Sequence, residues 1–497
     1  MWPYALTRRL AFVVPFAMLT TAYASAQSVN PGTNGATPTK PQAPTPIFTN
    51  APTPAPSFTK EHPLFVSGDA RVYEFYRTNL VQNASNPNRQ DFNAGASLHA
   101  EYGIPTTYFS VGTTYTGAYP FGLDGRNAGT NPHVDNTLPG FSLSTFNEGY
   151  AQYSNDYVQV KLGDQIINTP WANAADSRIM PAAFQGISSS AQFAPGWRVF
   201  LDDMVAFEPR TASAFGRYTL LTAPVAGASN SLSPSETEIN TNGFIMPGIQ
   251  FQNRRLAVEV FDYDYLSIAN MIYSQVQYNF APDSPLKPFA GVQYASEGNS
   301  APSVVGKIQN STVGAQLGVT LARNLTFTAG ADYAPWNSET VSLAKCSAAT
   351  SATTGIFLPS GGTPNCVAHK GGTATIYYGG VASPYTDSYA ADPFYTTSIT
   401  QGMVDRRSAG TSEKLAATWQ PLNRQLRLIV SDAFYNYING AGPNLTREFD
   451  ADATYFLNKV RPGRYKGLSL RYRYADRTQP TLPYDFKYNR AQLEYDF

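Results

Sequence analysis

Charged residues are scarce in this sequence of 497 residues, since Asp, Glu, Lys and Arg together make up 14% of it. A soluble globular domain usually contains about 25%. Basic and acidic residues are equal in number at 35 each, so no excess of charge favours an anionic surface or a nucleic acid as partner. We therefore expect no nucleic-acid partner.

Long hydrophobic runs are absent after residue 26, where no apolar stretch approaches the ~18 residues that a membrane-spanning helix needs. Aromatic residues are abundant by contrast, with 32 Tyr, 29 Phe and 5 Trp, although the mean hydropathy is only −0.27. A chain rich in aromatic residues, poor in charge and without apolar helices is typical of a transmembrane barrel whose strands alternate between lipid and water.

Cysteine and histidine are rare as well. Cys346 and Cys366 flank a stretch rich in Gly, Thr, Ser and Ala, and export into an oxidising compartment predicts a disulfide that closes a surface loop. A metal or redox pair is the alternative, but only His369 lies nearby. The sequence contains no pair of histidines at metal-ligand spacing, no phosphate loop and no Gly-x-Ser-x-Gly motif, so we expect no enzyme activity, metal or cofactor.

The first 26 residues have the parts of a signal peptide. Arg8 and Arg9 precede an apolar core at 10–23, and Ala24-Ser25-Ala26 fits the small-x-small cleavage rule. A membrane anchor is the alternative, but the core is shorter than the ~20 residues of a spanning helix. Residues 27–62 are rich in Pro and predict an extended periplasmic linker, with cell-wall binding as the alternative.

Residues 63–497 are expected to form a single barrel, because the dominant period from residue 64 onward is two. Leu98 and Tyr102 share the apolar face of one segment, and His99 and Glu101 share its polar face, where His99 would line the interior. The same alternation recurs at 109–116, at 313–320 and, after a short turn at 322–324, at 325–333.

Three features favour a membrane barrel over a soluble sandwich. The apolar faces tend to end in aromatic residues. Short connections such as 155–156 and 461–463 alternate with long ones such as 120–140 and 340–375. The chain ends on alternating apolar residues up to Phe497, which resembles the signature that directs bacterial outer-membrane proteins to their insertion machinery. At roughly 9–11 residues per spanning strand plus loops, the length allows about 16 to 20 strands, enough to enclose an aqueous channel.

Two stretches resemble the OprD-like outer-membrane porins. The first runs from Leu162-Gly163-Asp164-Gln165 to Phe184-Gln185-Gly186, and the second runs from Glu448-Phe449-Asp450 to 466–475. The resemblance covers 64–497, and the long loops, the cysteine loop and the Pro-rich segment depart from it. It implies an all-β antiparallel barrel of 18 strands narrowed by an inward-folded loop. It also implies passive, partly selective diffusion of small polar solutes, often amino acids or other carboxylates.

Charged residues on the polar faces are the candidate pore-lining residues. Lipid-facing charge costs roughly 2–4 kcal/mol near the midplane, so alternation places them inside. These residues are Glu448, Asp450 and Asp452 on one strand, Arg471 and Arg473 on the next, and Arg427 nearby. Facing acidic and basic rows would orient dipolar solutes. Alternatively, the two rows pair across strands and stabilise the wall, and both roles can hold.

Asp176 and Arg178 belong to the first stretch and could line the constriction. Alternatively, Asp176 is a turn or cap residue and Arg178 ties the loop to the wall.

The sequence as a whole predicts a protein of the outer membrane of a Gram-negative bacterium, in contact with lipid and lipopolysaccharide, as a monomer or weak trimer. A general porin, an oligosaccharide channel, an outer-membrane hydrolase and an adhesin are the alternatives.

Overall fold

The computed structural model describes most of the region expected to form the barrel. The described residues are 63–78, 88–121, 142–174, 179–210, 212–220, 222–223, 237–238, 240–300, 308–321, 324–335, 337–342, 373–378, 381, 383–386, 391–403, 409–421, 425–439, 442–457, 467–479 and 485–497. The signal peptide predicted at 1–26, the Pro-rich linker predicted at 27–62 and both cysteines lie outside them. No helix among the described residues has the length and apolarity needed to cross a membrane.

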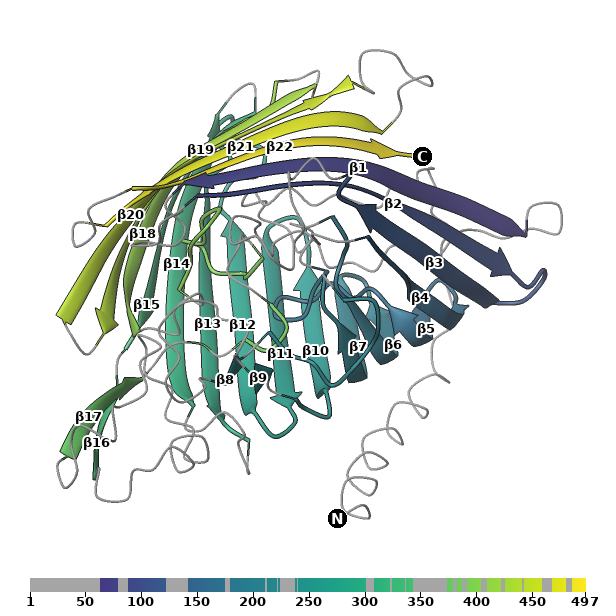
Figure 1. The fold of residues 1–497 in the computed structure, drawn as a ribbon, viewed down its shortest axis with the longest axis horizontal. Helices are drawn as coiled ribbons and strands as arrows, with labels where there is room; N and C mark the ends of the chain where they lie inside the picture. Colours follow the sequence, from purple (N-terminus) through teal and green to yellow (C-terminus); the bar gives the residue numbers. More distant parts are fainter. Residues whose placement is uncertain are drawn as a thin grey trace. The chain divides into compact units, whose positions relative to one another are not determined.

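Eighteen antiparallel strands form one closed sheet (Figure 1). In order around the barrel they are β1 (Leu64–Thr78), β2 (Arg89–Gly103), β3 (Phe109–Tyr119), β4 (Leu143–Ser154), β5 (Val158–Gln165), β6 (Ala183–Ala194), β7 (Trp197–Glu208), β10 (Phe244–Gln252), β11 (Leu256–Tyr265), β12 (Ala269–Asn279), β13 (Phe289–Asn299), β14 (Gln309–Leu321), β15 (Leu325–Ala334), β18 (Ala409–Trp419), β19 (Leu426–Asn439), β20 (Gly442–Phe456), β21 (Leu468–Thr478) and β22 (Phe486–Asp496).

The barrel closes where β22 pairs with β1, from Asp69 opposite Asp496 to Thr78 opposite Lys487. Closure leaves no unpaired sheet edge, which is the condition for strands to cross a membrane. Two further pairs of short strands, β8 (Thr222–Ala223) with β9 (Thr237–Glu238) and β16 (Asn337–Ser342) with β17 (Thr373–Tyr378), lie outside the closed sheet. The predicted all-β barrel of about 18 strands is confirmed.

The two faces of the sheet follow the alternation in the sequence. On β3, for example, Val111 and Tyr115 are exposed on the outside, whereas Ser110 and Thr114 are buried inside. An exposed apolar surface with a polar interior is what a lipid-facing barrel requires.

The connections differ between the two ends of the barrel. At the end that holds Leu64 and Phe497 most are short, as at 155–157, 195–196 and 253–255, although 280–288 and 457–467 are longer. Asn324 occupies the predicted turn between β14 and β15 with a φ of 58°, a left-handed conformation that Asn tolerates. At the other end most connections are longer, including 166–182, 209–243 and 335–408, although 266–268 and 440–441 are short. Short turns at one end and longer loops at the other are typical of outer-membrane barrels.

Candidate functional site

A cluster of arginines lies on the inner wall of β19–β21 around one carboxylate. Asp452 on β20 stands directly opposite Arg473 on β21, whose Nε donates to it at 3.0 Å. The Nε of Arg471 donates to the same carboxylate at 2.9 Å, and Nη2 of Arg427 donates to Thr454 Oγ1 at 3.2 Å. The predicted inward direction of these four charged side chains agrees with their burial.

The cluster carries a net positive charge. Arg427, Arg471 and Arg473 all interact electrostatically with Asp452, so three guanidinium groups share one carboxylate. Pairing across strands, the alternative that the sequence left open, therefore accounts for part of the charge only. An additional anion on the inner wall would offset the remainder, since guanidinium groups bind carboxylates through charge-assisted hydrogen bonds.

Arg490 extends the cluster onto β22 and was not among the residues proposed from the sequence. It stands opposite Arg473 in the β21–β22 register, and its guanidinium lies 4.1 Å from the centre of the Tyr73 ring. The alternation that puts Leu493 on the lipid side of the last strand would have placed Arg490 inside. No pattern in the sequence indicates that Arg490 lies beside Arg473 of β21, because that contact depends on the strand register.

Glu448 and Asp450 also point inward, but a segment of the β17–β18 connection covers them. We call residues 391–403 the inward segment. Glu448 Oε1 accepts a hydrogen bond from the amide of Thr400 at 2.7 Å, and Asp450 Oδ2 accepts one from the amide of Ile399 at 3.2 Å. These two acidic residues therefore contact protein rather than open channel.

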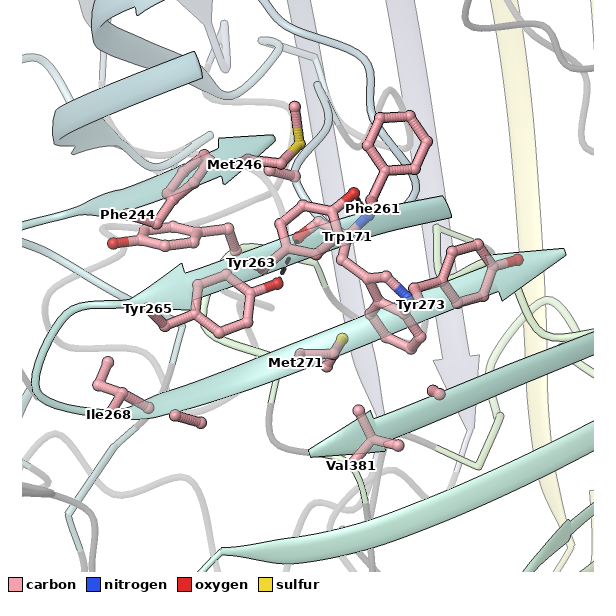
Figure 2. Packing of buried hydrophobic residues seen from close by; sticks show 14 of the residues in the cluster. Trp171, Phe244, Met246, Phe261, Tyr263, Tyr265, Ile268, Met271, Tyr273 and Val381 are labelled. Atoms are coloured by element: carbon pink, nitrogen blue, oxygen red, sulfur yellow. Dashed lines mark hydrogen bonds between the residues drawn. The ribbon is translucent and has the colours of Figure 1, made fainter. Parts of the chain in front are cut away.

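A second part of the interior is filled by the β5–β6 connection, through Trp171 (Figure 2). The indole is fully buried, with its ring centre 6.0 Å from that of Tyr273 on β12 and 5.1 Å from that of Phe394 in the inward segment. The backbone amide of Trp171 donates to the hydroxyl of Tyr263 on β11 at 3.2 Å. Asn173 Nδ2 donates to the carbonyl of Ala391 at 3.1 Å, so the two connections meet inside the barrel. The inward-folded loop implied by the resemblance is confirmed.

Asp176 and Arg178 lie outside the described residues, between two buried parts of the β5–β6 connection. Ala174 is buried on one side of them, and Ile179 and Met180 are buried on the other. Their lining of the constriction stays a prediction, as does the disulfide between Cys346 and Cys366.

His99 lies inside the barrel, as its alternating position predicted, within a hydrogen-bonded group on β2–β5. Its Nδ1 is 2.8 Å from Thr114 Oγ1, and Thr114 donates to Glu148 Oε2 at 2.6 Å. Glu101 on β2 accepts from Ser110 at 2.5 Å and from Tyr150 at 3.3 Å. These contacts tie neighbouring strands together, so we assign this group to the wall.

The described residues contain no cluster of His, Cys, Asp and Glu that could hold a metal ion.

In the inward segment, burial raises the pKa of the Tyr395 hydroxyl, and the negative charges of Asp332 and Glu259 raise it further. Tyr395 is therefore neutral near pH 7.

No protein-family model matches the sequence, and no curated protein matches it significantly. Solved structures do match. OccK9 (OpdG) of Pseudomonas aeruginosa has a TM-score of 0.64 at 16% identity, over 87% of this chain and 98% of that one. A BenF-like porin from Pseudomonas fluorescens Pf-5 has a TM-score of 0.65 at 12% identity, over the same shares of the two chains.

A third structure, OccK2 (OpdF) of Pseudomonas aeruginosa in complex with glucuronate, has a TM-score of 0.61 at 13% identity, again over 87% and 98% of the chains. These proteins are porins of the OprD family. At such identities the likeness establishes a shared fold, which is the fold that the sequence motifs at 162–186 and 448–475 indicated.

Proposed function

We propose that this chain, which has the fold of the OprD-like porins, is an outer-membrane channel for the passive diffusion of small polar solutes, with a preference for those that carry a carboxylate. The observation that carries this proposal is the net positive arginine cluster on the inner wall of a closed barrel with an apolar exterior.

The chemistry of diffusion through such a channel needs no reacting group. A solute carboxylate approaching the inner wall would exchange hydration for hydrogen bonds from guanidinium groups that Asp452 alone does not neutralise. Arg471 is the most accessible of the three, with 12% of its side chain exposed. The solved neighbour that contains glucuronate, itself a carboxylate, supports this class of solute. Localisation in the outer membrane of a Gram-negative bacterium belongs to the same proposal.

Single-channel recording in planar bilayers tests the proposal, with amino acids, organic acids and neutral sugars as blocking solutes. We expect small conductance steps that organic acids block better than sugars. In Arg471→Gln, the loss of one charged hydrogen-bond donor should weaken block by organic acids about tenfold and lower the anion preference.

Arg447→Gln is the matched control. Arg447 lies on β20 but faces outward, with 53% of its side chain exposed and a bidentate pairing to Asp432. Block should be unchanged in this variant. Equal block by sugars and acids would indicate a general porin instead, and a folded barrel without conductance would contradict the channel function altogether.

A further inference from the structure

The inward segment has little regular structure of its own. Among its described residues, the internal backbone hydrogen bonds include Thr397 to Phe394 at 3.3 Å and Ser398 to Gln401 at 2.8 Å. Its residues are nevertheless buried, with Thr396, Thr400 and Gln401 at 1% exposure or less. Buried backbone groups must find partners, so the conformation of this segment depends on the wall.

Three carboxylates of the wall supply acceptors to the segment. Asp332 on β15 accepts from both the amide and the hydroxyl of Thr396, at 2.9 and 2.5 Å. Glu448 on β20 accepts in the same way from the amide and hydroxyl of Thr400, at 2.7 and 2.6 Å. Asp450, two residues further along β20, accepts from the amide of Ile399 at 3.2 Å.

Donors from the wall reach the carbonyls of the same segment. The hydroxyl of Tyr435 on β19 donates to the carbonyl of Thr396 at 2.6 Å, and that of Tyr437 donates to Gly402 at 2.9 Å. Lys414 on β18 donates to the carbonyl of Thr397, and its ammonium interacts electrostatically with all three carboxylates. The positive charge of Lys414 therefore partly balances the negative charge of the three carboxylates.

The wall is also shaped to receive the segment. A Cβ atom added at Gly291 on β13 would lie 2.5 Å from the Tyr395 hydroxyl oxygen, and one added at Gly330 on β15 would lie 3.1 Å from the Tyr395 Cβ. Glycine at these inward positions leaves room for Tyr395 against the strands. On its other side the segment contacts Trp171 and Asn173 of the β5–β6 connection, so it extends from the wall at β15 and β18–β20 into the barrel.

We propose that Asp332, Glu448 and Asp450 form a carboxylate latch that holds the inward segment in the channel and thereby sets the size limit for solutes. This inference rests on the proposed channel function and adds a structural role for two acidic residues that the sequence suggested as solute contacts. Because the segment obtains most of its hydrogen bonds from the wall, loss of latch contacts releases it and widens the bore.

Conductance of latch variants is the test. Glu448→Ala with Asp450→Ala should raise the single-channel conductance about twofold and admit larger neutral sugars in liposome swelling. Glu101→Ala is the matched control, since Glu101 is an inward carboxylate of β2 that accepts hydrogen bonds from Ser110 and Tyr150 of the wall. That variant should conduct like the unsubstituted protein.

A reversible lock separates release of the segment from a general disturbance of the wall. The hydroxyl oxygens of Thr396 and Ser412 lie 2.6 Å apart, so Thr396→Cys and Ser412→Cys can form a disulfide between the inward segment and β18. The lock is introduced with Cys346→Ser and Cys366→Ser to leave one cysteine pair. When oxidised, it should return the Glu448→Ala, Asp450→Ala protein to the lower conductance, and a reductant should restore the higher one.

Thr400→Val keeps the experiment decisive if the double variant does not fold, because it removes one donor to Glu448 without changing the barrel. It should shift conductance in the same direction by a smaller factor. Unchanged conductance and sugar cut-off in every folded latch variant would overturn the latch while leaving the channel in place. Absence of conductance in the unsubstituted protein would instead overturn the proposed function.

Discussion

At the scale of single residues, Gly68 and Phe497 join the first and last strands of the barrel. Their backbones exchange hydrogen bonds, Gly68 amide to Phe497 carbonyl at 3.0 Å and Phe497 amide to Gly68 carbonyl at 2.9 Å. A Cβ atom at Gly68 would lie 2.5 Å from the Phe497 ring and 2.4 Å from the carbonyl oxygen of Ser97. The absent side chain thus allows the terminal ring to pack against β1.

Gly68→Val should therefore weaken the seam between β1 and β22. Overpacking of a close contact costs about 1–3 kcal/mol, so the barrel should lose its compact migration in SDS gels at a lower temperature. Ala70→Val is the control, because residue 70 is the next outward position of β1 and is exposed. An equal shift in both variants would contradict a specific role for Gly68.

At the scale of elements, the strands and the connections are stabilised differently. Each barrel strand is hydrogen-bonded on both sides, whereas the described parts of the β5–β6 and β17–β18 connections depend on side chains. Trp171 is central to this packing because it contacts wall strands and the inward segment at once. The connections should accordingly open at a lower free energy than the strands.

Trp171→Ala should loosen both connections and leave the barrel folded. Truncation of a buried Trp costs roughly 3–5 kcal/mol, which here falls on the loop packing rather than on the strand ladder. Limited proteolysis of the folded protein should cleave within 166–174 or 391–403 faster than in the unsubstituted chain. Trp419→Ala, at an outward and exposed Trp of β18, should leave the cleavage rate unchanged. Equal rates for all three proteins would contradict the packing role.

At the scale of the whole molecule, the barrel has large apolar side chains on its outer face and charged ones in its interior, which is the reverse of a soluble protein. On β14, Leu317 is 64% exposed and its neighbour Gln316 is 4% exposed. The stability of such a molecule depends on a lipid or detergent environment that removes the outer surface from water.

Leu317→Arg should destabilise the barrel in phospholipid vesicles by about 2–4 kcal/mol, because residue 317 is outward and near the middle of β14. Gln309→Arg lies on the same face but at the end of the strand, where the cost should fall to about 0–1 kcal/mol. Urea titration of the free energy of unfolding measures both. A loss that does not depend on position along the strand would show that this face does not contact the lipid core.

The fold class and the direction of most side chains follow from local patterns in the sequence. Period-two alternation is a local property, so Arg427, Asp452, Arg471 and Arg473 could be placed inside before any contact was known. The apolar terminal strand and the absence of long apolar runs excluded helices as the spanning elements. The strand number and the inward loop came from the resemblance at 162–186 and 448–475.

The contacts of each inward charge, in contrast, depend on the folded barrel and not on local sequence. Alternation cannot distinguish Asp452, which binds arginines, from Glu448, which binds Thr400 of the inward segment. Arg490 lies opposite Arg473 because of the β21–β22 register, and Trp171 packs against Tyr273, which is distant from it in the sequence. These contacts exist because closure of the barrel brings distant strands and connections into one interior, and a local sequence pattern contains no information about that closure.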